Sequence, residues 1–424
     1  MERRISPEEA RLGMYICGFG GSWFDHPFWR VRFVLRKDSD LERLQQSGVP
    51  YVVIDDALGI GPVEPEPEAA PSPAAARPPR KMAAPRRLAE PAPRPAPAGD
   101  YGAAQQAAER RQAIALVSRS KKVMRYVFEG ARLGRAVKVA EVLDVVDDIT
   151  RSVERAPRTL LDVIRLKNRD EYTYFHSVAV CTLMVNFARH LGLGEEETRE
   201  LGLAGLLHDI GKMSIPDEVL NKPDRLTDEE FAVVRAHPER GYKMLSETPE
   251  VSAAALDVCR HHHEKMDGRG YPYGLAAEDI SRAARMGAIC DVYDALTSDR
   301  IYKAAWHPSE ALAAMWGWED QFDRALLFAF MQSLAVFPEG MLVRMRSNRL
   351  AIVLKSKRRN ARTRVLCFYN TCEGSFIPAE ETVLGPGLAS DSIVAPATPE
   401  EWGLRDWEAM AARLLGSDAV PLVA

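Results

Sequence analysis

The sequence predicts a multidomain α+β protein with a mostly helical centre, on three observations. Its 424 residues correspond to two or three domains at about 150 residues each. Apolar residues recur with helical spacing through the middle of the chain, whereas β-type runs occur near both ends. A proline-rich segment separates the first β-type runs from the helical part. The 46% apolar and 27% charged residues are typical of globular proteins.

Residues 1–60 are expected to form a small α/β domain. Three runs rich in β-branched and aromatic residues predict strands, at Met14–Cys17, Val31–Leu35 and Tyr51–Ile54. Between the last two, Asp38–Gln46 has the apolar spacing of a short helix.

Residues 61–100 are expected to be a flexible linker rich in proline and alanine. This stretch contains 12 of the 28 prolines and almost no large apolar residue, so it cannot bury enough surface to fold. Connecting helices are expected over 101–139 and a helical domain over 140–340. Residues 341–424 should close the chain as a short β-meander with a terminal helix, and apolar runs predict its strands at Leu342-Val343, Ala351–Leu354 and Val365–Tyr369. The basic run 344–364 is expected to form a solvated hairpin face, with a phosphate- or partner-binding face as the alternative.

Charge and cysteine usage limit the class of protein. The net charge of −4 argues against a protein that binds nucleic acid polymers by its overall charge. No run of about 18 apolar residues predicts a membrane span, and no apolar stretch follows the charged N-terminus as in a secretory signal. The six cysteines are scattered without a C-x-x-C pair, which favours reduced thiols and a cytoplasmic location.

Histidines and acidic residues concentrate in the helical domain. The pair His208-Asp209 ends the apolar run 201–207, and a carboxylate is costly to bury there unless it meets a cation. The other members of this group are His176, His237 and the triplet His261–His263. Imidazole and carboxylate together suit divalent iron, manganese or zinc, so the sequence predicts a metal site.

The spacing of these residues makes the prediction more specific. Adjacent residues on a helix point about 100° apart, so His262 and His263 can share one ion only near a helix end. The glycine- and proline-rich loop 267–274 predicts such an end. Arg300 and Lys303 share a helix face, and two cations there suit a phosphate-bearing substrate. Lys212 lies one turn after His208 and can reach the same substrate.

Several motifs in order resemble the HD superfamily of metal-dependent phosphohydrolases, and more narrowly its HD-GYP branch. The motifs are His176-Ser177-x-x-Val180, His208-Asp209-Ile210-Gly211-Lys212, His237-Pro238, His262-His263-Glu264-x-x-Asp267-Gly268-x-Gly270-Tyr271-Pro272, Asp291-Val292-Tyr293-Asp294 and Asp299-Arg300-x-Tyr302-Lys303. The likeness covers roughly residues 140–340 and implies an HD-type helical core. Leu12-Gly13-Met14-Tyr15, Ser22-Trp23 and His26-Pro27-Phe28 resemble a small domain of unknown function often fused ahead of HD-GYP domains.

The resemblance implies a role for each matching residue. His176, His208, Asp209 and Asp291 would hold one metal, and Asp209, His237, His262 and His263 the other, with Asp209 bridging. Lys212, Arg300 and Lys303 would contact phosphate. Tyr271 would lie near the substrate or on a surface offered to partners. Asp209 and Lys212 are thus the catalytic candidates, and His261 is left out of the ligand set.

The resemblance also implies an activity. HD-GYP proteins hydrolyse cyclic di-GMP to linear pGpG and often on to GMP, here by a hydroxide activated by two divalent ions, with iron or manganese favoured. Two ions are expected because Tyr172 stands where relatives with a third metal carry Glu. Two alternatives stay open: hydrolysis of another nucleotide, or a non-catalytic adaptor that binds cyclic di-GMP or a cyclase. The partners to consider are cyclic di-GMP, a diguanylate cyclase (GGDEF) protein and a second copy of the chain. The cyclase would bind through the loop 267–274, which carries Gly270-Tyr271-Pro272 and is called the GYP loop below.

Overall fold

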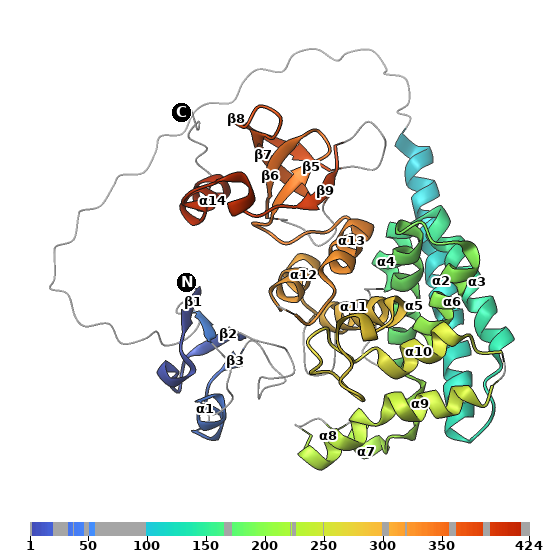
Figure 1. Ribbon diagram of the computed structural model, residues 1–424. Coiled ribbons are helices and arrows are strands. Elements are labelled where there is room, and N and C mark those ends of the chain that lie inside the picture. The colour runs from blue at the N-terminus through green and yellow to red at the C-terminus, as the bar shows by residue number, and fades with distance from the viewer. Residues whose placement is uncertain are drawn as a thin grey trace, which may run out of the picture. The chain divides into compact units, whose positions relative to one another are not determined.

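The computed structural model divides the chain into two compact units, residues 1–108 and 109–424 (Figure 1). The residues that it describes are 2–19, 33–36, 38–45, 51–55, 99–164, 172–220, 222, 226–248, 250–298, 305–318, 320–355, 362–384 and 391–416. The expected linker 61–100 lies outside them except for its last two residues. Along these ranges, no helix combines the length and apolar character needed to cross a bilayer.

The first unit contains a four-stranded antiparallel sheet in the order β1-β4-β2-β3. Its elements are β1 (Glu2–Ile5), a 3-10 turn η1 (Pro7–Glu9), β2 (Tyr15–Phe19), β3 (Phe33–Val34), α1 (Asp38–Gln45) and β4 (Val52–Asp55). Alternate residues of β4, Val52 and Ile54, face a small core with Met14, Ile16 and Leu44. The small α/β domain is therefore present, with one strand, β1, that the sequence did not predict.

The second unit is built mainly from helices. They are α2 (Gly99–Arg132), α3 (Val139–Arg155), α4 (Pro157–Ile164), α5 (Tyr172–His190), α6 (Glu195–Leu207), η2 (Ile210–Ser214), α7 (Asp217–Leu220), α8 (Asp228–Arg235), α9 (His237–Ser246), α10 (Ala253–His261), η3 (Ala277–Asp279), α11 (Arg282–Thr297), α12 (Pro308–Gly317) and α13 (Arg324–Leu334). One core joins α2 to α6 with α10 to α13. The helical centre expected from the sequence is confirmed.

Small residues let two helices approach closely beneath the predicted site. A Cβ atom on Gly205 of α6 would lie 2.7 Å from the Cα of Cys181 on α5, so only glycine allows this contact. The pair brings the start of α5, with His176, beside the end of α6, where His208 lies. The backbone packing of α5 and α6 thus positions two predicted ligands.

A second close approach joins η2 to α9. A Cβ atom on Gly211 would lie 1.9 Å from the carbonyl oxygen of His237 and 2.6 Å from the nitrogen of Gly241. This backbone contact holds the turn that follows Asp209 directly against the helix that begins at His237. This close backbone contact therefore explains why the HD-x-G-K motif has glycine at position 211.

The chain closes with a five-stranded antiparallel sheet in the order β8-β7-β6-β5-β9. Its elements are β5 (Leu342–Met345), β6 (Arg349–Val353), β7 (Arg364–Asn370), β8 (Ser375–Val383) and β9 (Ile393–Pro396), followed by η4 (Glu400–Trp402) and α14 (Trp407–Leu415). One face of the sheet joins the helical core, and the other packs with α14. The predicted β-meander and terminal helix are present, and in the basic run Arg349 and Arg364 pair with carboxylates of β8.

Candidate metal centre

Most of the seven predicted ligands lie near helix ends or in short turns that face one another. His176 is in the first turns of α5, His208 caps α6, Asp209 precedes η2, and His237 opens α9. The helix end that the sequence predicts is present, because α10 ends at His261 and His262 is its cap. Asp291 projects from the middle of α11. Six of the seven are buried, with His263 partly buried.

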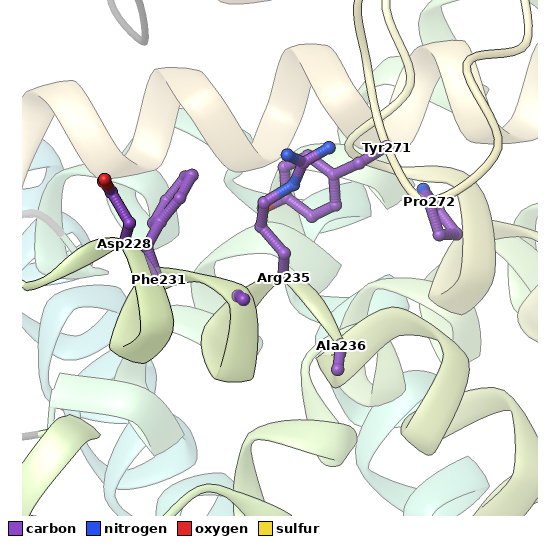
Figure 2. Close-up of a pocket in the computed structure, with 7 residues that line it drawn as sticks. Asp228, Phe231, Arg235, Ala236, Tyr271 and Pro272 are labelled. Atoms are coloured by element: carbon purple, nitrogen blue, oxygen red, sulfur yellow. The ribbon is translucent and has the colours of Figure 1, made fainter.

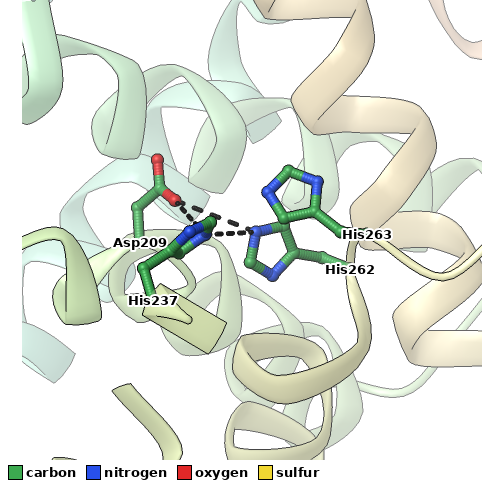
Figure 3. A group of neighbouring side chains, drawn as sticks. All are labelled: Asp209, His237, His262 and His263. Carbon is green, nitrogen blue, oxygen red and sulfur yellow. Dashed lines mark hydrogen bonds and ion pairs between the residues drawn. The ribbon is translucent and has the colours of Figure 1, made fainter. Parts of the chain in front are cut away.

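These residues form two clusters. One comprises His176, His208 and Asp291; the other comprises Asp209, His237, His262 and His263, and within each cluster the ligand atoms lie within 4.8 Å of one another. Figure 3 shows the second cluster, in which the rings of His237 and His262 turn toward Asp209. The two Nε2 atoms of those rings are 3.5 Å apart.

Asp209 lies between the two clusters. Its Oδ2 is 3.5 Å from His176 Nε2 and 3.4 Å from His208 Nε2, while its Oδ1 is 3.3 Å from His237 Nε2 and 3.8 Å from His262 Nε2. Oδ1 is buried and accepts no hydrogen bond from any residue of the described ranges. A buried carboxylate oxygen without a donor is costly, and a cation offsets that cost. The donor set of imidazole and carboxylate therefore fits divalent cations.

Backbone carbonyl groups orient three of the imidazole rings. A carbonyl oxygen can only accept, so each Nδ1 must carry the proton and each Nε2 keeps its lone pair for the cluster. The pairs are His208 Nδ1 with Gly205 O at 2.9 Å, His237 Nδ1 with Val234 O at 2.7 Å, and His262 Nδ1 with Val258 O at 2.9 Å.

A carboxylate orients the fourth ring. Asp294 Oδ2 lies 2.7 Å from His176 Nδ1, and the Ser298 hydroxyl donates to Asp294 Oδ1 at 3.1 Å. On the opposite edge of the same ring, Asp291 Oδ1 lies 2.9 Å from Nε2. Asp291 and Asp294 are spaced i, i+3 and so share a face of α11, but only the fold shows that they meet opposite edges of one imidazole.

The charges in the centre favour ionised carboxylates and neutral rings at the second cluster. Burial opposes charge on Asp209, yet Lys212 and His208 hold the pKa of this carboxyl well below its usual range. Burial, assisted by His208, lowers the pKa of His262 to about 3. Burial, assisted by His262, also lowers the pKa of His263 well below its ordinary value. These are the protonation states that metal ligands need.

His176 differs from the second cluster. Burial favours its neutral form, but the hydrogen bonds to Asp291 and Asp294 outweigh burial and raise its pKa. The same contact with His176 helps to hold the pKa of Asp291 well below normal, against the effect of burial. The first cluster thus favours charge on both its ring and its carboxylate, in contrast to the second.

Of the four predicted substrate residues, the structure describes two, Lys212 and Tyr271. Lys212 Nζ lies 2.5 Å from Asp209 Oδ2, and its side chain is 23% exposed, so it spans from the buried carboxylate toward solvent. The Tyr271 ring stacks on His263 with centroids 4.6 Å apart and an interplanar angle of 27°. Arg300 and Lys303 lie outside the described residues.

Glu264 organises the loop that carries Tyr271. This buried carboxylate accepts the backbone N–H groups of Tyr273 at 2.8 Å and Leu275 at 3.0 Å. A Cβ atom on Gly270 would lie 2.4 Å from the Cα of Glu264, so the loop can pack here only with glycine. The Glu264 in the motif was visible in the sequence, but its role as an acceptor for the loop required the fold.

His261 points away from both clusters. Its Nδ1 lies 2.8 Å from Asp257 Oδ1, and its ring meets Tyr273 edge to face at 5.8 Å. Asp257 in turn accepts a hydrogen bond from Ser281. The triplet thus contributes two rings to the metal centre and one to a separate carboxylate pair.

Comparison with known proteins finds two family models along the chain. A domain of unknown function (DUF3391) matches residues 2–142, and an HD domain matches residues 158–326. The chain is 46% identical over 414 residues to a cyclic di-GMP phosphodiesterase of Pseudomonas aeruginosa, covering 97% of this chain and 95% of that protein.

Two further relatives match a smaller part of the chain. The cyclic di-GMP phosphodiesterase response regulator RpfG of Xanthomonas campestris is 48% identical over 30% of this chain and 34% of its own length. A 3'3'-cGAMP-specific phosphodiesterase of Vibrio cholerae is 34% identical over 39% of this chain and 32% of its own length. The metal-dependent chemistry of HD-domain phosphohydrolases agrees with the two clusters.

Proposed function

Because the chain belongs to the HD-GYP family of HD-domain phosphodiesterases, with a DUF3391 domain ahead of the HD domain, we propose that it hydrolyses cyclic di-GMP to linear pGpG and on to GMP. The observation that carries this proposal is a pair of ligand clusters that share the carboxylate of Asp209. Such a pair suits cleavage of a phosphodiester by two divalent cations.

The residues that would hold the two cations follow from the clusters. His176, His208 and Asp291 would hold one, and His237, His262 and His263 the other, with Asp209 between them. When bound, the cations supply Lewis acidity, which makes a water nucleophilic near neutral pH and offsets charge on the phosphoryl oxygens. Iron or manganese is proposed because both accept mixed imidazole and carboxylate ligands.

The chain itself orients the reactants. The carbonyl groups of α6, α8 and α10 and the carboxylate of Asp294 keep each Nε2 lone pair aimed inward, so the ligands need little rearrangement. The Lys212 ammonium has three donors, and one can stay on Asp209 while another binds a phosphoryl oxygen. This positive charge stabilises the charge that develops as the P–O bond breaks. Arg300 and Lys303 are proposed as further phosphate contacts.

A turnover assay with metal analysis tests the function. Purified protein supplied with Mn²⁺ or Fe²⁺ should convert cyclic di-GMP to pGpG and GMP, resolved by chromatography, with two metals per chain. Asp209→Ala should abolish turnover, because it removes the carboxylate that lies between both clusters. His261→Ala is the matched control, since it removes an imidazole of the same triplet whose ring bonds Asp257 instead.

The alternatives give different outcomes in the same assay. Two bound metals with cleavage of another nucleotide but not of cyclic di-GMP would contradict the substrate. Tight binding of cyclic di-GMP without turnover in the metal-loaded protein would favour the adaptor. Loss of turnover in His261→Ala equal to that in Asp209→Ala would contradict the assignment of the ligands.

A partner surface is proposed at the GYP loop. Tyr273 in this loop is half exposed, its hydroxyl donates to Glu239 Oε2 at 2.6 Å, and Arg260 packs on its ring. An aromatic side chain held in place at the surface suits a protein contact, here with a diguanylate cyclase domain. Tyr273→Ala should weaken co-purification of such a domain, whereas unchanged capture would contradict this surface.

A homodimer and a cytoplasmic location are also proposed. Light scattering tests the homodimer, and the free buried thiols fit a cytoplasmic location.

A further inference from the structure

A pocket of about 510 Å³ opens on the outer side of Tyr271. It is lined by Asp228, Phe231 and Arg235 of α8 together with Tyr271 and Pro272 of the GYP loop (Figure 2). This volume lies within the range of small-molecule sites. The three residues of α8 are spaced i, i+3 and i+7, so they project from one face of the helix, as Figure 2 shows.

The pocket is joined to the metal centre by stacked side chains. The Arg235 guanidinium lies 4.8 Å from the centroid of the Tyr271 ring, whose stacking partner is His263 of the second cluster. Tyr271 therefore contacts both the pocket and the second cluster. With its base in the pocket, a nucleotide would direct its phosphodiester toward the ligand clusters.

The pocket wall carries opposite charges on either side of an aromatic ring. Along α8, Phe231 lies between Asp228 and Arg235, and the Arg235 guanidinium is 6.0 Å from its ring centroid. Within the described ranges neither Asp228 nor Arg235 forms an ion pair or a side-chain hydrogen bond, and both are exposed. Both charged groups are therefore available to a ligand.

This arrangement matches guanine among the purines. Guanine offers acceptors at O6 and N7, which arginine binds in a bidentate manner, and donors at N1 and N2, which a carboxylate can accept. Adenine offers an amino group where guanine has O6, so arginine would meet a donor there. Seven residues of helix span about 10.5 Å, which leaves room for a purine stacked on Phe231 between the two charges.

We propose that this pocket is a guanine subsite of the substrate, in which Phe231 stacks on the base, Arg235 binds its O6/N7 edge and Asp228 binds its N1/N2 edge. The subsite rests on the proposed phosphodiesterase function and names the residues that select the base. It assigns to α8 a role in substrate choice that is distinct from metal binding.

The test compares base selectivity in the full-length, Mn²⁺-loaded protein. The kcat/KM values for cyclic di-GMP and cyclic di-AMP are measured for the parent, Asp228→Asn and Arg235→Gln. A bidentate base contact is worth a discrimination of about tenfold to a hundredfold. Each variant should therefore lower the guanine-to-adenine ratio at least tenfold. Part of the change should be a gain on cyclic di-AMP, since carboxamides pair with adenine.

Controls separate the subsite from general damage. Glu229→Gln removes a negative charge from the same turn of α8 but does not line the pocket, so its ratio should equal that of the parent. Bis(p-nitrophenyl) phosphate, which has no base, normalises each variant for the metal centre. Ratios within twofold of the parent in both pocket variants would overturn the subsite. A parent with two bound metals that cleaves neither dinucleotide would instead overturn the proposed function.

Discussion

Replacing Asp294 by Asn should weaken metal binding at the first cluster. Asp294 Oδ2 lies 2.7 Å from His176 Nδ1, and both side chains are buried. A hydrogen bond that involves a charged group contributes about 1.5–3 kcal/mol. Asn can turn its amide N–H groups toward Nδ1, and the ring would then carry its proton on Nε2, where the metal must bind.

The magnitude follows from that hydrogen bond. Because about 1.4 kcal/mol corresponds to a factor of ten, losing 1.5–3 kcal/mol should lower the affinity for Mn²⁺ about 10- to 100-fold. Competition with a chromophoric chelator measures the affinity, and metal analysis after dialysis gives the ions retained per chain. We expect Asp294→Asn to retain one tightly bound ion and lose the other.

The chain supplies a matched control. Asp257 contacts an imidazole, His261 Nδ1, at 2.8 Å and accepts from a serine, as Asp294 does, but outside the clusters. Asp257→Asn should therefore leave metal affinity unchanged. The reasoning is refuted if Asp294→Asn binds both ions as tightly as the parent, or if Asp257→Asn loses metal to the same extent.

Three further outcomes are expected. Gly211→Ala should destabilise the protein by about 2–3 kcal/mol, because its Cβ would overlap the backbone of α9, whereas Gly317→Ala, with open space around its Cβ, should not; urea unfolding compares them. In the metal-free protein, the free energy of unfolding should fall as the pH drops from about 6.5 toward 3. The pKa of His262 is about 3 in the folded chain and about 6.5 in the unfolded chain, so in this range the unfolded chain binds a proton that the folded chain does not. His262→Gln should flatten that fall, and an unchanged slope would count against this cause. Burial raises the pKa of the Cys290 thiol well above its ordinary value, so a thiol reagent should label exposed Cys372 before Cys290. Mass spectrometry of the labelled native protein measures the order, and labelling of Cys290 first would contradict this prediction.

The sequence predicted the parts of the fold in which periodicity is strong. Helical spacing located the central domain, and short continuous apolar runs located β5 to β7. The two strands of the C-terminal sheet that it did not predict, β8 and β9, are the edges of that sheet. Edge strands need little apolar surface and tolerate proline, and β8 is mostly exposed and contains Pro378 while β9 ends at Pro396. Their residues therefore carry almost no strand pattern.

The candidate site divides in a similar way. Residue type and the helix end before the loop allowed His262 and His263 to share one ion, and the family resemblance assigned both to one ligand set. Sequence spacing could not reveal that Asp294 meets the far edge of the His176 ring, or that Arg235 lies over Tyr271, because both contacts join elements far apart in the chain. Side-chain partners across helices follow from tertiary packing, which a single sequence does not specify.

The two oxygens of Asp209 divide between the clusters, and this has a consequence for how the protein fills with metal. Two cations held there would share the charge of one carboxylate, so each would alter the affinity of the other. By linkage, that effect is equal in both directions. A titration with metal should therefore depart from the curve expected for two independent sites.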